Sequence, residues 1–169
     1  MEKKISIFTD GSCKGNPGPG GFGVVIMEND EIKHTYSERC DNTTNNREEL
    51  KAIIYALQYA DEIYPKENVT IYSDSSYCVN ACNDWIWNWA RACWKNSKKV
   101  TVENLDLIQI IYGITNRDFY HCQIVKIKGH DGKFGNELAD ALATDDTKKY
   151  DKIINDKYIN NSNLIQCCC

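Results

Sequence analysis

The N-terminal part of the chain alternates apolar and polar positions in the pattern of β-strands. Residues 4–10 carry largely apolar side chains on both faces, which predicts a strand in the middle of a sheet. Two more strands are expected at 22–27 and 32–39, and the short polar segment between them predicts an antiparallel hairpin. Residues 11–21 hold five glycines and two prolines, so a tight, irregular turn is expected between the first two strands.

Helical periodicity begins at Thr44. Apolar residues at positions 50, 53, 54 and 57 have helical spacing and predict a helix that ends near Ile63, before Pro65. The pattern predicts further elements in this order: a strand at 69–74, a helix at 75–83, a Trp-rich helical segment, a helix at 104–115, a strand at 122–128, and a helix from about 136 to 158 with a break near Asp145. The crossovers favour parallel pairing of the first, fourth and fifth strands. We therefore expect an α/β fold with a five-stranded mixed sheet, three antiparallel strands followed by two parallel ones, flanked by helices.

Three acidic residues occupy positions where burial of a charge is costly. Asp10 ends the first strand, Asp74 ends the fourth, and Glu49 lies on the long helix. Neighbouring parallel strands would bring Asp10 and Asp74 together at one sheet edge, where they repel unless a proton or a metal intervenes. Oxygen-only ligands suit a hard cation such as Mg²⁺ or Mn²⁺.

Helix geometry distinguishes the two neighbouring acids on the long helix. Glu49 lies about 90° from the apolar stripe, at its margin, whereas Glu48 lies roughly opposite it. We expect Glu49 to reach the sheet edge and Glu48 to be a solvated surface charge.

The charge of the whole chain says little about function, but one segment has an unusual charge pattern. The formal net charge of -4 argues mildly against a general nucleic-acid binder, because such proteins cluster Lys and Arg toward phosphates. Residues 85–102 differ, since they contain no Asp or Glu and mix four basic residues with four tryptophans. The segment is either a docking surface or a solvated helix with an aromatic core edge, and the pattern alone leaves both open.

The nine cysteines show no zinc-like pairing. Without a signal peptide or an apolar run of about 18 residues, we expect a cytoplasmic protein with reduced thiols, no membrane association and a disordered Cys167–Cys169 tail.

Several segments, in order and at matching spacing, resemble the type 1 ribonucleases H. They are IFTDGSCKGNPGPGGFG, TTNNREEL, IYSDSSYC, WIWNWARACWK, VENLDL and KGHDGKFGNELADALA. The resemblance implies the ribonuclease H-like fold and a catalytic domain at 1–148. Residues 149–169 would then form a helical extension and tail, and no separate hybrid-binding domain is expected before Ile5.

The resemblance also implies an activity and a set of site residues. The activity is two-metal hydrolysis of the RNA strand of RNA–DNA hybrids, with two Mg²⁺ ions that Mn²⁺ can replace, leaving 5′-phosphate and 3′-hydroxyl ends. Metal-binding carboxylates would be Asp10, Glu49, Asp74 and Asp140, and His130 would assist proton movement or product departure. From the residues alone, Asp140 is better explained as an acid stabilised by the dipole at a helix start, and His130 could be only a loop residue.

Substrate contacts are implied in the same way. The RNA strand would contact Cys13, Asn16, Asn45, Glu49 and Ser76, and the DNA strand Asn46 and Trp85, with a phosphate near Thr44 and Asn104. Arg91, Lys95, Lys98 and Lys99 would form a basic protrusion. The resemblance suggests a monomer without an obligate protein partner. Ser76 and Asn42 depart from the family pattern and the protrusion is lightly charged, so we expect modest affinity for the hybrid.

Three alternatives are less consistent with these motifs. A related nuclease or strand transferase, such as an integrase or a domain detached from a reverse transcriptase, would share the fold. A non-cutting hybrid-binding module would lack a carboxylate, and none is missing. A dinucleotide-binding loop at GNPGPGG would need amide donors where prolines stand.

Overall fold

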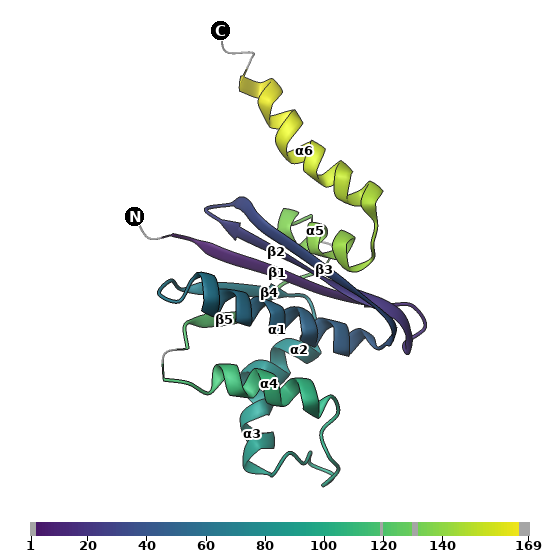
Figure 1. Ribbon diagram of the computed structural model, residues 1–169, viewed down its shortest axis with the longest axis vertical. Helices are drawn as coiled ribbons and strands as arrows, with labels where there is room; N and C mark the ends of the chain where they lie inside the picture. The colour runs from purple at the N-terminus through teal and green to yellow at the C-terminus, as the bar shows by residue number, and fades with distance from the viewer. Residues whose placement is uncertain (1–2, 119, 130–131, 166–169) are drawn as a thin grey trace.

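A five-stranded mixed sheet forms the centre of the fold (Figure 1). The computed structural model describes residues 3–118, 120–129 and 132–165. The strand order is β3-β2-β1-β4-β5, with antiparallel pairing of the first three strands and parallel pairing of β1 with β4 and of β4 with β5. The strands are β1 (Ile5–Cys13), β2 (Gly18–Glu28), β3 (Glu31–Thr43), β4 (Val69–Ser73) and β5 (Cys122–Lys126). The predicted α/β class and strand pairing are confirmed.

The hairpin of β1 and β2 is longer than the sequence pattern predicts. Pairing continues past Asp10 to Cys13, which lies opposite Gly20, so most of the expected turn at 11–21 is strand. The expectation of an irregular turn over that whole range is wrong. Glycines can adopt strand geometry when a partner strand pairs with their backbone N–H and C=O groups. The local sequence pattern reflects only the preference of glycine for turns.

One face of the sheet packs against α1 and α2, and α3 and α4 lie beyond them, with α4 packed on α1. α1 spans Asn45–Ile63, with Thr44 as its N-cap. α2 (Ser76–Asn80), a π-helical turn η1 (Ala81–Trp85) and α3 (Ile86–Arg91) follow one another, and α4 is Leu105–Thr115. Apolar residues of these helices and of the sheet form the larger core cluster, which includes the fully buried Ile7, Leu50 and Ile108.

The opposite face of the sheet is covered by α5, and α6 packs beside α5 and extends outward from it (Figure 1). α5 spans Phe134–Ala143, α6 spans Thr147–Ile165, and Asp145 between them has a positive φ of 57°. The predicted break near Asp145 is confirmed, while α5 begins slightly earlier and α6 ends later than predicted. In the part of the chain that the structure describes, no helix is long and apolar enough to cross a membrane.

Candidate active site

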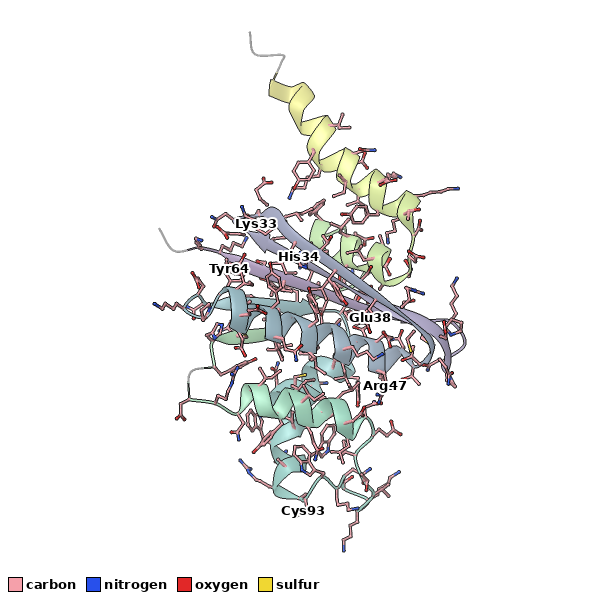
Figure 2. The ribbon with its side chains drawn as sticks, viewed as in Figure 1. Lys33, His34, Glu38, Arg47, Tyr64 and Cys93 are labelled. Atoms are coloured by element: carbon pink, nitrogen blue, oxygen red, sulfur yellow. The ribbon has the colours of Figure 1, made fainter. Side chains whose placement is uncertain are left out.

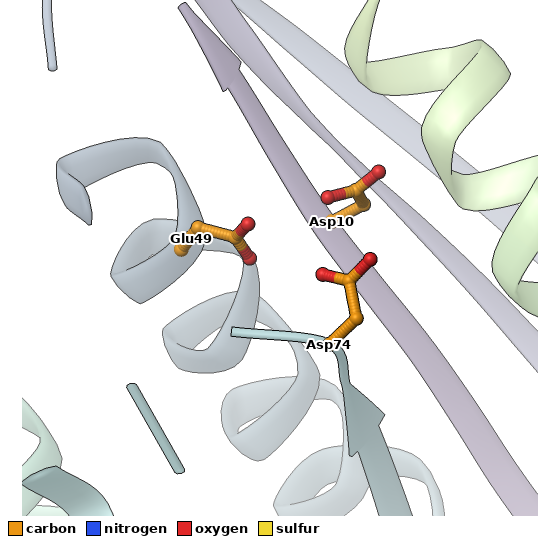
Figure 3. A group of neighbouring side chains, drawn as sticks. All are labelled: Asp10, Glu49 and Asp74. Atoms are coloured by element: carbon orange, nitrogen blue, oxygen red, sulfur yellow. The ribbon is translucent and has the colours of Figure 1, made fainter. Parts of the chain in front are cut away.

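Asp10, Glu49 and Asp74 meet at one edge of the sheet. β1 and β4 are parallel and pair Thr9 with Ser73, so the residues that follow, Asp10 and Asp74, are neighbours. Asp74 directly follows the end of β4, but β1 continues to Cys13, so the prediction that Asp10 ends its strand is wrong. Each of the three acids offers an oxygen within 4.8 Å of the oxygens of the other two (Figure 3). The juxtaposition predicted from the strand ends and the helix face is therefore present.

A glycine allows α1 to approach β1 closely enough for this arrangement. A Cβ atom on Gly11 would lie 2.3 Å from the backbone nitrogen of Glu49, a distance that no real contact tolerates. The same residue donates its backbone N–H to Oδ1 of Asp10 at 2.8 Å, which orients that carboxylate. Glu49 is consequently only 3% exposed, and Asp10 only 7%.

The pKa values of Asp10 and Glu49 are raised. Burial, the charges of Asp74 and Asp140 and a hydrogen bond with Asp140 raise the pKa of Asp10 to about 8. Burial and the charges of Asp10 and Asp74 likewise raise the pKa of Glu49 well above its ordinary value. Adjacent carboxylates in a site of low dielectric hold protons until a cation replaces them.

These residues fit a divalent metal ion. Oε2 of Glu49 is buried and has no hydrogen-bond partner among the described residues, an arrangement that normally costs free energy. The donor set consists only of carboxylate oxygens, which suits a hard cation of the Mg²⁺ or Mn²⁺ type. A bound cation would satisfy the orphan oxygen and relieve the repulsion at the same time.

Asp140 joins this group from the opposite face of the sheet. It lies on α5, its side chain is 20% exposed, and its charge and a hydrogen bond with it contribute to the raised pKa of Asp10. All four predicted carboxylates therefore lie together, although Asp140 is outside the tight triad. The predicted role of His130 concerns a residue outside the described ranges.

The prediction that Glu48 is a solvated surface charge is wrong. It is 1% exposed, not solvated, and its Oε1 accepts hydrogen bonds of 2.7 Å from both Thr43 Oγ1 and Lys51 Nζ. The position of Glu48 opposite the apolar stripe of α1 does not by itself expose the side chain. The last residue of β3 covers the opposite side of the first turn, and only the tertiary structure reveals that cover.

The predicted RNA and phosphate contacts gather near the start of α1. Thr44 caps α1 by accepting from the backbone of Arg47, and Asn16 Oδ1 accepts from the backbone of Asn45 at 2.9 Å. Arg47 donates to Asn104 Oδ1 at 3.4 Å and pairs with Asp106 at 2.7 Å, which joins α1 to α4; Figure 2 labels it on α1. The other members are a half-buried Cys13 at the end of β1, Asn46 in the first turn of α1 and an exposed Ser76 at the start of α2.

The Trp-rich segment combines an aromatic core edge with an open hollow, and its role as a docking surface stays a prediction. Trp87 and Trp94 pack edge-on against Tyr112 of α4, with ring centroids 5.6 and 5.3 Å away. Trp85 and Trp89 instead line an open hollow of about 500 Å³ together with Lys95. The four basic residues of the protrusion, Arg91, Lys95, Lys98 and Lys99, are all exposed.

Lys149 is a site residue that no sequence pattern indicated. Its Nζ pairs with Asp140 and lies 2.9 Å from Glu137 Oε2. The acids are one turn apart on α5, but the lysine belongs to the next helix, so no spacing pattern within one element could have indicated the contact.

Comparisons with known proteins agree with this geometry. The RNase H family model matches residues 2–148. The chain is 46% identical to the ribonuclease H of Chlorobium phaeovibrioides over 144 residues, which cover 85% of this chain and 94% of the relative. It is 42% identical to the ribonuclease H of Francisella tularensis subsp. novicida over 142 residues, which cover 84% of this chain and 90% of the relative.

Solved structures give the same result. LC9-RNase H1, described as a type 1 RNase H, superposes with a TM-score of 0.72 at 28% identity over 86% of this chain and 72% of its own. LC11-RNase H1, solved in complex with RNA/DNA hybrid, superposes with a TM-score of 0.63 at 28% identity over 86% of this chain and 98% of its own. The matched lengths, the mixed sheet and the acidic cluster at its edge lead to one conclusion: this chain belongs to the RNase H family.

Proposed function

We propose that this protein is an endonuclease that hydrolyses the RNA strand of RNA–DNA hybrids and leaves 5′-phosphate and 3′-hydroxyl ends. The observation that carries the proposal is the close triad of the buried Asp10 and Glu49 with the partly exposed Asp74, in a chain of the RNase H family. The hybrid bound to the similar LC11-RNase H1 supports the choice of substrate.

The four carboxylates would hold two Mg²⁺ ions, which Mn²⁺ could replace. Bound divalent cations supply activation of the attacking water and stabilisation of the departing 3′ oxygen. Within the chain, the Gly11 amide orients Asp10, and the close approach of α1 keeps Glu49 facing it. The buried positions of Asp10 and Glu49 limit competing water, which strengthens their electrostatic attraction for a cation. His130 remains our candidate for proton movement or product departure.

Specificity would arise from groups that test the minor groove. Only RNA presents a 2′-hydroxyl there, and short polar side chains together with backbone groups can detect it. We assign this task to Cys13, Asn16, Asn45, Glu49 and Ser76.

The DNA strand would follow the other side of the groove. Asn46 and Trp85 would contact it, and Thr44 and Asn104 would hold one phosphate. The exposed Arg91, Lys95, Lys98 and Lys99 would add attraction that depends on salt concentration.

Several properties complete the proposal. We propose a catalytic domain at 1–148 with an extension at 149–169, a monomeric state without an obligate protein partner, and a cytoplasmic location. Gel filtration with light scattering would test the oligomeric state directly, and a dimer would refute that part alone.

The test offers labelled RNA–DNA hybrid, RNA duplex and DNA duplex to the purified protein with Mg²⁺. We expect cutting of the RNA strand of the hybrid only, and a loss of at least roughly a hundredfold in Asp74→Asn and in Glu49→Gln. Glu48→Gln is the matched control, because it changes a neighbouring buried acid that lies outside the cluster and should leave cutting intact.

Two results would contradict the proposal. One is equal cutting of the DNA duplex, and the other is full activity in Asp74→Asn. Tight binding of the hybrid without cutting by the parent protein would instead favour the binding-module alternative.

A further inference from the structure

The start of α6 is held firmly beside α5. Tyr150, Ile153 and Ile154 pack against the apolar cluster on the outer face of the sheet, which includes Val25 and Leu138. Farther along α6, Lys157 lies 4.0 Å from the centroid of the Phe134 ring and donates to the Asp30 carbonyl at 2.7 Å. These contacts fix the position and rotation of the helix.

A cap fixes the first turn of α6 as well. Asp146 Oδ1 accepts the backbone N–H of Lys149 at 2.9 Å, as an N-cap side chain does. The Asp146 carbonyl accepts the N–H of Tyr150 at 3.0 Å and continues the helix. The backbone position of Lys149 is therefore fixed by the helix cap as well as by the ion pairs of its side chain.

Lys149 bridges two acids of α5. Its ammonium pairs with Oδ2 of Asp140 and with Oε2 of Glu137, while 30% of the lysine side chain and 20% of each acid remain exposed. Asp140 in turn is one of the groups that raise the pKa of Asp10, and its helix α5 packs on β1. The second helix of the pair thus delivers a positive charge to the margin of the carboxylate cluster.

We propose that Lys149 is a positioning residue of the metal site, which holds the Asp140 carboxylate when no cation is bound and competes with a cation for it. This inference rests on the proposed function, because it takes Asp140 as a metal ligand. A positive charge this close to a ligand lowers the affinity for a second cation by direct repulsion. Glu137 provides the ammonium with an alternative partner when Asp140 turns toward a metal ion.

A different result is expected if the Lys149–Asp140 ion pair only holds α6 against α5. Loss of a tether would lower stability equally with and without metal and would leave metal affinity unchanged. A competitor for Asp140 predicts lower stability without metal and tighter metal binding. The two roles are therefore separable by measurements that do not use catalysis.

The experiment titrates MnCl₂ into protein without nucleic acid and counts free Mn²⁺ by electron paramagnetic resonance. It compares the parent with Lys149→Met, Lys149→Arg and Lys152→Met, since Lys152 is an exposed lysine of the same helix. Thermal unfolding of each protein in EDTA and in Mn²⁺ provides the second readout.

We expect Lys149→Met to bind Mn²⁺ about three- to tenfold more tightly than the parent, the range expected for removing one partly exposed charge. Its unfolding temperature should fall in EDTA, and the rise caused by Mn²⁺ should exceed that of the parent. Lys149→Arg should bind Mn²⁺ as the parent does or more weakly, and Lys152→Met should match the parent in both measurements.

Equal Mn²⁺ affinity of the parent, Lys149→Met and Lys149→Arg would overturn the inference. In that case a loss of Mn²⁺ binding in Asp74→Asn would show that the metal site of the proposed function still stands. Absence of Mn²⁺ binding by the parent itself would overturn both the inference and the metal site. If Lys149→Met does not fold, tighter binding by Lys149→Arg than by the parent would refute the competition by itself.

Discussion

Asp10 should destabilise the metal-free protein, although it lies at the centre of the proposed site. The residue is 7% exposed and faces two other carboxylates, and its pKa is raised to about 8. The Asp10→Asn variant retains the shape of the side chain and an acceptor for the Gly11 amide, but removes the charge. We expect this variant to be inactive and, in the absence of metal, more stable than the parent.

The magnitude follows from proton linkage. Because the pKa is higher in the folded than in the unfolded chain, where its ordinary value is 3.8, the folded state binds the proton more tightly. This contribution to stability is fully present below about pH 4 and is lost as the pH rises to about 8. By pH 7 the loss amounts to about 4 kcal/mol, at about 1.4 kcal/mol for each pH unit.

Urea denaturation in EDTA at pH 5, 7 and 8.5 measures the effect. The free energy of unfolding of the parent should fall across this range, and that of Asp10→Asn should fall less. At pH 7 we expect the variant to be more stable by about 2 to 4 kcal/mol, or roughly 4 to 16 °C in unfolding temperature for a chain of this size. Added Mg²⁺ should stabilise the parent strongly and the variant little, because a ligand stabilises only the state that binds it.

Two outcomes would refute this reasoning. One is a parent whose stability in EDTA does not change between pH 5 and 8.5. The other is an Asp10→Asn variant that is no more stable than the parent at pH 8.5. Either would mean that the carboxylates relax apart when no cation is present.

Three further predictions concern two residues beside the triad and one in the hollow of the Trp-rich segment. Gly11→Ala should lower the free energy of unfolding by about 1 to 3 kcal/mol and reduce cutting, because the added Cβ forces α1 and Glu49 away from β1; urea denaturation and the hybrid assay check this. Glu48→Gln should cost about 1 to 2 kcal/mol of stability in urea, because the partly buried ammonium of Lys51 loses its charged partner, and a variant as stable as the parent would contradict this. Trp85→Ala should raise the KM for the hybrid and leave kcat unchanged in steady-state kinetics, because this 38% exposed ring lines the hollow and lies outside the carboxylate cluster; a fall in kcat alone would refute its binding role.

Local patterns predicted much of the fold because they follow from backbone geometry. The apolar strands, the spacing of the apolar residues on α1 and the break at Asp145 depend on neighbours in sequence, and all three are observed. The glycine-rich hairpin was predicted less well. Its strands extend through glycines that pair with a partner strand, and that partner is not visible in the local pattern.

The sequence by itself determined the class of the protein, the order of its strands and the nomination of Asp10, Glu49 and Asp74. These follow from residue types at strand ends and on a helix margin, and the resemblance added Asp140. Only the tertiary structure decided the burial of Glu48 beneath β3 and the pairing of Lys149 with Asp140. Both contacts join different elements, and their energies depend on distances and exposure that chain folding sets and that residue spacing along the sequence does not encode.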